Sequence, residues 1–175
     1  MVFAVLASSS GDPADMLAEP GEWIWSSLIT RDVDAGATFY QTLFDCEVVD
    51  LPSDDSKAAH VLLATDIDAR ASANTLPAEN PNVHPHWLNF VRVHDAAKTA
   101  AKVVSLDGKV LLEPHLDQHG GDVAVMVDPP APPFGLLEWT QRDSNKVARR
   151  HSSLHTSRDI NWRRYDFWHS PHILL

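Results

Sequence analysis

The sequence has little of what several classes of protein require. A single cysteine, Cys46, excludes an intramolecular disulfide and is typical of a reducing compartment. No apolar run approaches the roughly 20 residues of a transmembrane helix. The opening residues, MVFAVLASS, also lack the basic start of a secretory signal. We therefore expect a cytoplasmic protein without a membrane partner.

Catalytic motifs are also missing. No serine or cysteine stands in a pattern typical of a nucleophile with its base. No glycine-rich phosphate loop is present, because the Gly-Gly pair at 120–121 is at best a hairpin signal. The net charge of −10 disfavours nucleic acid as a partner. Residues 146–175 are the exception, with six basic residues against two acidic ones.

What the chain does contain is one order of elements that occurs twice. Alternation and helical periodicity predict a strand, a helix and three strands at 23–31, 33–44, 46–51, 60–65 and 69–76. The same order is predicted at 86–93, 95–106, 109–114, 122–128 and 134–139, and a further strand at 1–9. At an offset of 62 residues, Trp25 aligns with Trp87 and Asp45 with Asp107. We expect Ala35, Phe39 and Leu43 to form the packing face of the first helix, and Asp32 or Asp34 to cap it.

These residues resemble a known family. WSSLITRDVDAGATFYQTLF, LDGKVLLEP and DPPAPPFGLLEW are similar to motifs of the vicinal oxygen chelate superfamily, which contains glyoxalase I, bleomycin-resistance proteins and extradiol dioxygenases. The resemblance implies an α+β fold, in which paired βαβββ modules form a curved mixed sheet that encloses a cleft, with the helices outside.

The resemblance also implies a domain organisation. Residues 22–140 form a glyoxalase-like domain with modules at 22–78 and 84–140, and residues 141–175 form a basic, aromatic C-terminal extension. Residues 1–21 resemble the last strand and linker of a preceding domain, as in tandem members of the family; an ordinary N-terminal extension is the alternative.

Many members of this family bind a divalent metal through His or Glu on the cleft strands. The resemblance places such ligands at Trp25, Leu88 and Gly135, and a register slip would replace Leu88 with Trp87 or His86. The strand at 69–76 offers no acid or histidine, and Glu138 falls on the opposite face of its strand. We therefore expect no metal and no cofactor. His84 and His86 are typical of solvated loop histidines, although His86 borders a cleft strand.

Strand alternation assigns the side chains that face the cleft. The predicted ligand-binding residues are Trp25, Ser27, Ile29, His60, Leu88, Phe90, Arg92, Gly135, Leu137 and Trp139. Such a set suits a planar or hydrophobic small molecule, with Arg92 pairing an anionic group or stacking on a ring. The alternative is that the aromatic side chains simply fill a core, with Arg92 at its rim.

The sequence thus predicts a homodimeric, bleomycin-resistance-like protein that binds a small apolar or aromatic ligand in a metal-free cleft. Two alternatives stay open. One is a metal-dependent lyase, isomerase or dioxygenase of the glyoxalase type, and the other is a structural half of a larger tandem-domain protein.

Overall fold

The computed structural model describes residues 9, 11, 18–51, 59–65, 68–76, 78, 81–116, 121–129 and 132–138. Its elements are β1 (Trp23–Thr30), α1 (Val33–Phe44), β2 (Glu47–Asp50), β3 (His60–Thr65), β4 (Asp68–Thr75), β5 (His86–Val93), α2 (Ala96–Ser105), β6 (Lys109–Leu116), β7 (Asp122–Val127) and β8 (Pro133–Glu138). Every helix and strand predicted between residues 23 and 139 is present, to within two residues at its ends. The strand predicted at 1–9 falls outside the described residues except for Ser9, and the extension at 141–175 falls outside them entirely.

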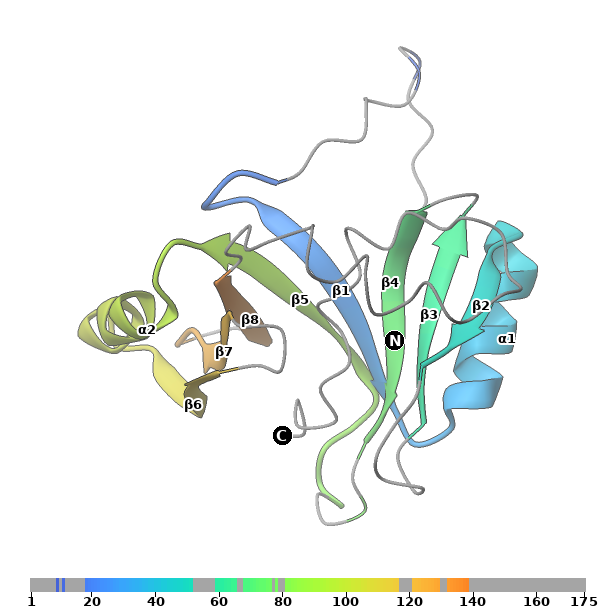
Figure 1. Ribbon diagram of the computed structural model, residues 1–175. Coiled ribbons are helices and arrows are strands. Elements are labelled where there is room, and N and C mark those ends of the chain that lie inside the picture. The colour runs from blue at the N-terminus through green and yellow to red at the C-terminus, as the bar shows by residue number, and fades with distance from the viewer. Residues whose placement is uncertain are drawn as a thin grey trace.

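The eight strands form one open mixed sheet in the order β2-β3-β4-β1-β5-β8-β7-β6 (Figure 1). The two modules join at its centre, where β1 and β5 pair antiparallel. Within each module the first and last strands pair parallel, β1 with β4 and β5 with β8. Helix α1 packs on the first module and α2 on the second. The predicted α+β fold of two βαβββ modules is confirmed.

The two modules correspond at an offset of 63 residues up to their helices, so the offset of 62 is wrong there. Asp32 caps α1 and Asp95 caps α2, each accepting a hydrogen bond from the backbone N–H three residues on. Trp25 therefore matches Leu88 and not Trp87, whose indole Nε1–H donates to the Tyr40 hydroxyl on the helix side of the sheet.

Where the helices end the offset is 62, and at the last strand of each module it is 63 again, since Ser72 pairs with Ser27 as Gly135 pairs with Phe90. Asp45 and Asp107 both adopt left-handed backbone conformations, with φ of 53° and 65°, where the chain leaves each helix. One residue fewer lies between cap and turn in the second module. A shorter helix thus explains why a single offset does not describe the whole repeat.

The packing face of α1 differs from the prediction. Ala35, Phe39 and Leu43 were expected to pack inward, which is wrong: Phe39 and Leu43 are 52% and 46% exposed. The helix instead buries Val33, Ala37 and Tyr40. The reason lies in two small residues.

Gly36 and Ala37 let α1 lie close to β1. A Cβ atom on Gly36 would already stand 2.9 Å from Leu28 Cδ2, so no large side chain fits at this contact. The side of the helix that carries these small residues therefore faces the sheet, and Phe39 and Leu43 face outward.

The opposite side of the sheet, which we call the helix-free face, carries its own core. Twelve buried residues from six strands and their connections form one cluster: Trp25, Ile29, Leu51, Leu62, Ala64, Ala69, Leu76, Leu88, Phe90, Val123, Val125 and Leu137. Since both modules contribute, this cluster holds the two halves of the sheet together through apolar burial.

Candidate functional site

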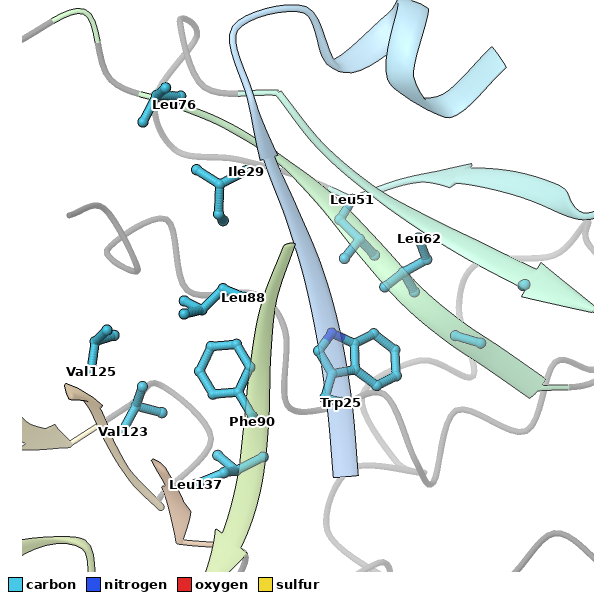
Figure 2. Packing of buried hydrophobic residues seen from close by; sticks show 12 residues of the cluster. Trp25, Ile29, Leu51, Leu62, Leu76, Leu88, Phe90, Val123, Val125 and Leu137 are labelled. Atoms are coloured by element: carbon cyan, nitrogen blue, oxygen red, sulfur yellow. The ribbon is translucent and has the colours of Figure 1, made fainter. Parts of the chain in front are cut away.

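The centre of the helix-free face is built by the four parallel-paired strands β1, β4, β5 and β8. Alternation along each strand brings together Trp25 and Ile29, Leu88 and Phe90, and Leu137, as Figure 2 shows. Five of the predicted ligand-binding residues therefore share one cluster. Trp139 lies outside the described residues.

This cluster is tightly packed. Leu88 and Phe90 are fully buried, and Trp25 is 8% exposed. The Phe90 ring lies directly over Gly135, where an added Cβ atom would stand only 2.0 Å from Phe90 Cδ1. The side chains themselves thus fill this interior, as in the alternative in which the aromatic residues form a core, and no larger residue than Gly135 fits under the ring.

A buried hydrogen-bond network lies beside these rings, centred on Ser72 of β4. The Ser72 hydroxyl oxygen accepts from Trp25 Nε1 at 3.2 Å and from Asn74 Nδ2 at 3.1 Å. It also lies 2.7 Å from the Ser27 hydroxyl. Ser27 and Ser72 are both fully buried, so these bonds satisfy polar groups that solvent does not reach.

Counting donors assigns the direction of the last bond. A serine hydroxyl has one hydrogen and two lone pairs. Ser72 already accepts from an indole and an amide, so its hydrogen goes to Ser27. The hydrogen of Ser27 is then left for another acceptor.

Sequence reasoning missed Ser72 and Asn74. The stretch ARASANTL was predicted as a strand without acids or histidines, and neither residue was assigned to the site. The available signal was the spacing of two between the two polar residues, which places both on one face of a strand. Only the register of β4 against β1, with Ser72 opposite Ser27, shows that they meet a partner.

Two histidines lie in one row across the same face. His60 of β3 pairs with Asn74, Asn74 with Ile29, and Ile29 with His86 of β5. His86 Nδ1 lies 2.8 Å from the His84 carbonyl oxygen, which only accepts, so Nδ1 carries the hydrogen. In the neutral imidazole Nε2 is then the acceptor, and it is buried without a hydrogen-bond partner among the described residues.

Arg92 ends the row of side chains that β5 turns to the helix-free face. It is partly buried, and its Nη1 donates to the Ala18 carbonyl at 2.5 Å. Its Nε is buried with no hydrogen-bond partner in the part of the chain that the structure describes. Polar His86 and Arg92 thus stand at the two ends of β5, with apolar Leu88 and Phe90 between them.

The residues at the family's metal positions do not fit a metal. The 63-residue correspondence adds Ser72 to Trp25, Leu88 and Gly135 as the fourth equivalent position. These residues form no ligand set for a divalent ion. Trp25 offers an indole, Leu88 an aliphatic chain and Gly135 no side chain, and the Ser72 hydroxyl already makes three hydrogen bonds.

Nothing nearby substitutes for the missing ligands. No group of three or more His, Cys, Asp or Glu side chains that could hold a metal occurs within the described ranges. Glu138, predicted to point to the opposite face, accepts from the backbone N–H of Ala96 at the start of α2.

Cys46 lies apart from this site. It is buried among the residues that pack under α1, and burial raises the pKa of its thiol. A protonated, enclosed thiol is a poor nucleophile.

None of the described helices is long and apolar enough to cross a membrane.

Comparisons with known proteins agree with this architecture. A model of the Glyoxalase/Bleomycin resistance protein/Dioxygenase superfamily matches residues 24–136. The putative glyoxylase CFP32 of Mycobacterium tuberculosis is 29% identical over 125 residues, covering 71% of this chain and 47% of the relative. The chain thus spans about half the length of the curated relatives it matches.

Solved structures of the same fold include two methylmalonyl-CoA epimerases. That of Mycobacterium tuberculosis is 17% identical with a TM-score of 0.51, over 77% of this chain and 97% of the epimerase. A variant from Streptomyces coelicolor is 15% identical with a TM-score of 0.50, over 72% of this chain and 99% of the epimerase. At these identities the likeness concerns the fold alone.

Proposed function

Because this chain belongs to the Glyoxalase/Bleomycin resistance protein/Dioxygenase superfamily, we propose that it binds a small apolar or aromatic molecule on the helix-free face without a metal ion. The observation that carries the proposal is the residue set at the four equivalent strand positions. Trp25, Ser72, Leu88 and Gly135 supply aromatic and apolar surface with one hydroxyl, and no metal ligand.

The chemistry of these groups favours binding over catalysis. A metal ion in such a site would polarise substrate oxygens, and no residue here replaces that role. An apolar surface with few convergent polar groups is instead typical of a small-molecule site. Here the polar groups are the Ser27 hydroxyl, the imidazoles of His60 and His86, and the Arg92 guanidinium.

The packed interior determines how such a ligand would be held. Trp25 and Phe90 fill the centre of the face, and only Trp25 is in part reached by solvent, so a bound ring would take the place of the Trp25 indole. Replacing one aromatic ring by another keeps the packing density that the core requires. We therefore expect binding to move Trp25 and to change the environment of its indole.

Tryptophan fluorescence tests this proposal. Titrating the protein with 2-phenylethanol should change its emission, and a Trp25→Ala variant that keeps its circular dichroism spectrum should lose most of that change. Trp23→Ala is the matched control, because Trp23 lies two residues away and is 63% exposed. An equal response from both variants would count against a site at Trp25.

Metal analysis separates this proposal from the metal-dependent alternative. The purified protein should contain no stoichiometric zinc, nickel, iron or manganese, and calorimetric titration with each ion should give no tight site. Tight binding of one ion per chain would overturn the metal-free proposal and favour a glyoxalase-type enzyme.

A further inference from the structure

We propose that Arg92 binds a carboxylate, so that the ligand of the helix-free face is a small apolar or aromatic carboxylic acid. This inference rests on the proposed function and names the chemical class of its ligand. It depends on how Arg92 is held, on which of its donors are used, and on the lack of a counter-ion around it.

The backbone of Arg92 is held on both sides. Its N–H donates to the Glu22 carbonyl at 2.9 Å, and its own carbonyl accepts from Gly21 N–H at 2.7 Å. In the sheet it lies opposite Leu137 of β8. Leu137 belongs to the apolar cluster, and so does Phe90, which precedes Arg92 on the same face of β5. Arg92 therefore lies at the border of that cluster.

The donors that remain on Arg92 include the pair that recognises a carboxylate. A guanidinium binds carboxylate oxygens in pairs, through two parallel N–H bonds along one edge. Nη1 is already engaged by the Ala18 carbonyl. The edge formed by Nε and Nη2 is left, and Nε is buried without a partner among the described residues.

No acidic side chain neutralises this charge within the described ranges. Asp95, three residues after Arg92, instead caps α2 and pairs with Lys98 at 2.8 Å. Glu22 is the acidic residue whose backbone pairs with that of Arg92. Its carboxylate accepts a hydrogen bond from Glu19 N–H at 2.7 Å instead. A guanidinium nitrogen that is shielded from water and unpaired is unfavourable, and a ligand oxygen that reaches it removes that cost.

Charge and surroundings favour a carboxylate over a phosphate. One guanidinium balances one negative charge, and a phosphate dianion would keep an excess charge beside Leu137 and Phe90. The chain as a whole also carries −10, which opposes a second negative charge at the site. A carboxylate attached to an apolar or aromatic body matches both the cation and the adjoining cluster.

Nuclear magnetic resonance of the 15N-labelled chain tests the assignment directly. The Arg92 Nε–H signal is identified by its loss in Arg92→Lys and is followed during titration with phenylacetate or with its neutral analogue phenylacetamide. We expect phenylacetate to shift this signal and to bind at least about tenfold more tightly than the amide. Arg92→Met should remove that preference, and Arg92→Lys should retain part of it.

Arg31→Met is the matched control. It removes the same charge, but Arg31 donates to the Pro81 and Val83 carbonyls in a loop and should leave phenylacetate binding unchanged. If Arg92→Met does not fold, the comparison of acid and amide on the unmodified protein still decides the question.

The outcomes separate this inference from the proposed function. Equal affinity for acid and amide, with no movement of the Arg92 signal, would refute the carboxylate site and leave the apolar binding site standing. Binding of neither compound would overturn both proposals. Inorganic phosphate shifting the signal as strongly as phenylacetate would overturn the choice of a carboxylate.

Discussion

The contact between Phe90 and Gly135 gives the sharpest test of how the helix-free face is packed. Gly135→Ala adds one methyl group at the position where metal-using relatives carry a closing-strand ligand. That carbon would lie 2.0, 2.3 and 2.6 Å from three ring atoms of Phe90. Carbon atoms pack at about 3.5–4.0 Å, so the ring would have to move by about 1.5 Å.

The size of the effect follows from the surroundings of the ring. Phe90 is fully buried, and its neighbours Leu88, Val125 and Leu137 are 0–1% exposed, so the ring has no free space to enter. Overpacking of this kind costs about 1–3 kcal/mol. With a severe overlap we expect Gly135→Ala to lower the free energy of unfolding by about 2–3 kcal/mol, which is about 4–12 °C in melting temperature for a chain of this size.

Urea denaturation followed by circular dichroism measures this effect, and a second variant tests its cause. Phe90→Leu removes the ring, so Gly135→Ala should cost at least about 1 kcal/mol less in that background than alone. Gly36→Ala is the matched control, because its new methyl group meets the terminal methyl of the flexible Leu28 side chain at 2.9 Å and Thr30 Cγ2 at an ordinary 3.6 Å. Its stability should stay within about 1 kcal/mol of the unmodified protein.

Two results would contradict this account of the packing. One is a Gly135→Ala variant as stable as Gly36→Ala. The other is strict additivity of the changes at residues 90 and 135, since residues in contact are expected to couple.

Three further predictions concern the buried polar groups and the thiol. Ser72→Ala removes the hydroxyl that accepts from Trp25 and Asn74 and donates to Ser27, and it should cost about 1–3 kcal/mol in urea unfolding, whereas Ser26→Ala, at a partly exposed position, should change stability by less than about 0.5 kcal/mol. Trp87→Phe removes the indole N–H donated to Tyr40 and should cost about 1 kcal/mol, with less than additive loss when combined with Tyr40→Phe. Burial raises the pKa of the Cys46 thiol, so the folded state holds this proton more tightly than the unfolded state. Its contribution to stability should be complete at neutral pH and be lost as pH rises through the usual thiol range, and Cys46 should react with a disulfide reagent slowly unless urea is present.

Local signals in the sequence were sufficient for the elements of the fold. Asp32 and Asp95 mark the starts of the helices because their carboxylates satisfy backbone N–H groups that no other residue reaches. Alternation along β1 and β5 was enough to predict that Trp25, Leu88 and Phe90 share one face. These are properties of neighbouring residues, and they need no knowledge of the rest of the chain.

The packing face of α1 depended on its distance from β1, which the residues of the helix alone do not determine. Periodicity alone favoured Phe39 and Leu43, since both are large and apolar. The approach of the helix to β1 instead selected the side that carries Gly36, because distance between the backbones decides which side chains fit. The same holds for Trp87, which matched Trp25 in sequence but lies on the opposite side of the sheet.

The sequence by itself determined the order of the elements, the duplication and the chemical character of each strand face, because these depend on spacing along one chain. Only the tertiary structure decided that Ser72 meets Trp25 and Ser27, that Phe90 occupies the space above Gly135, and that Arg92 retains an unused edge. Each of these contacts joins residues about 45 or more positions apart, or depends on which donors other segments have already engaged. Strand register and side-chain competition set such contacts, and neither is encoded in a local pattern of residues.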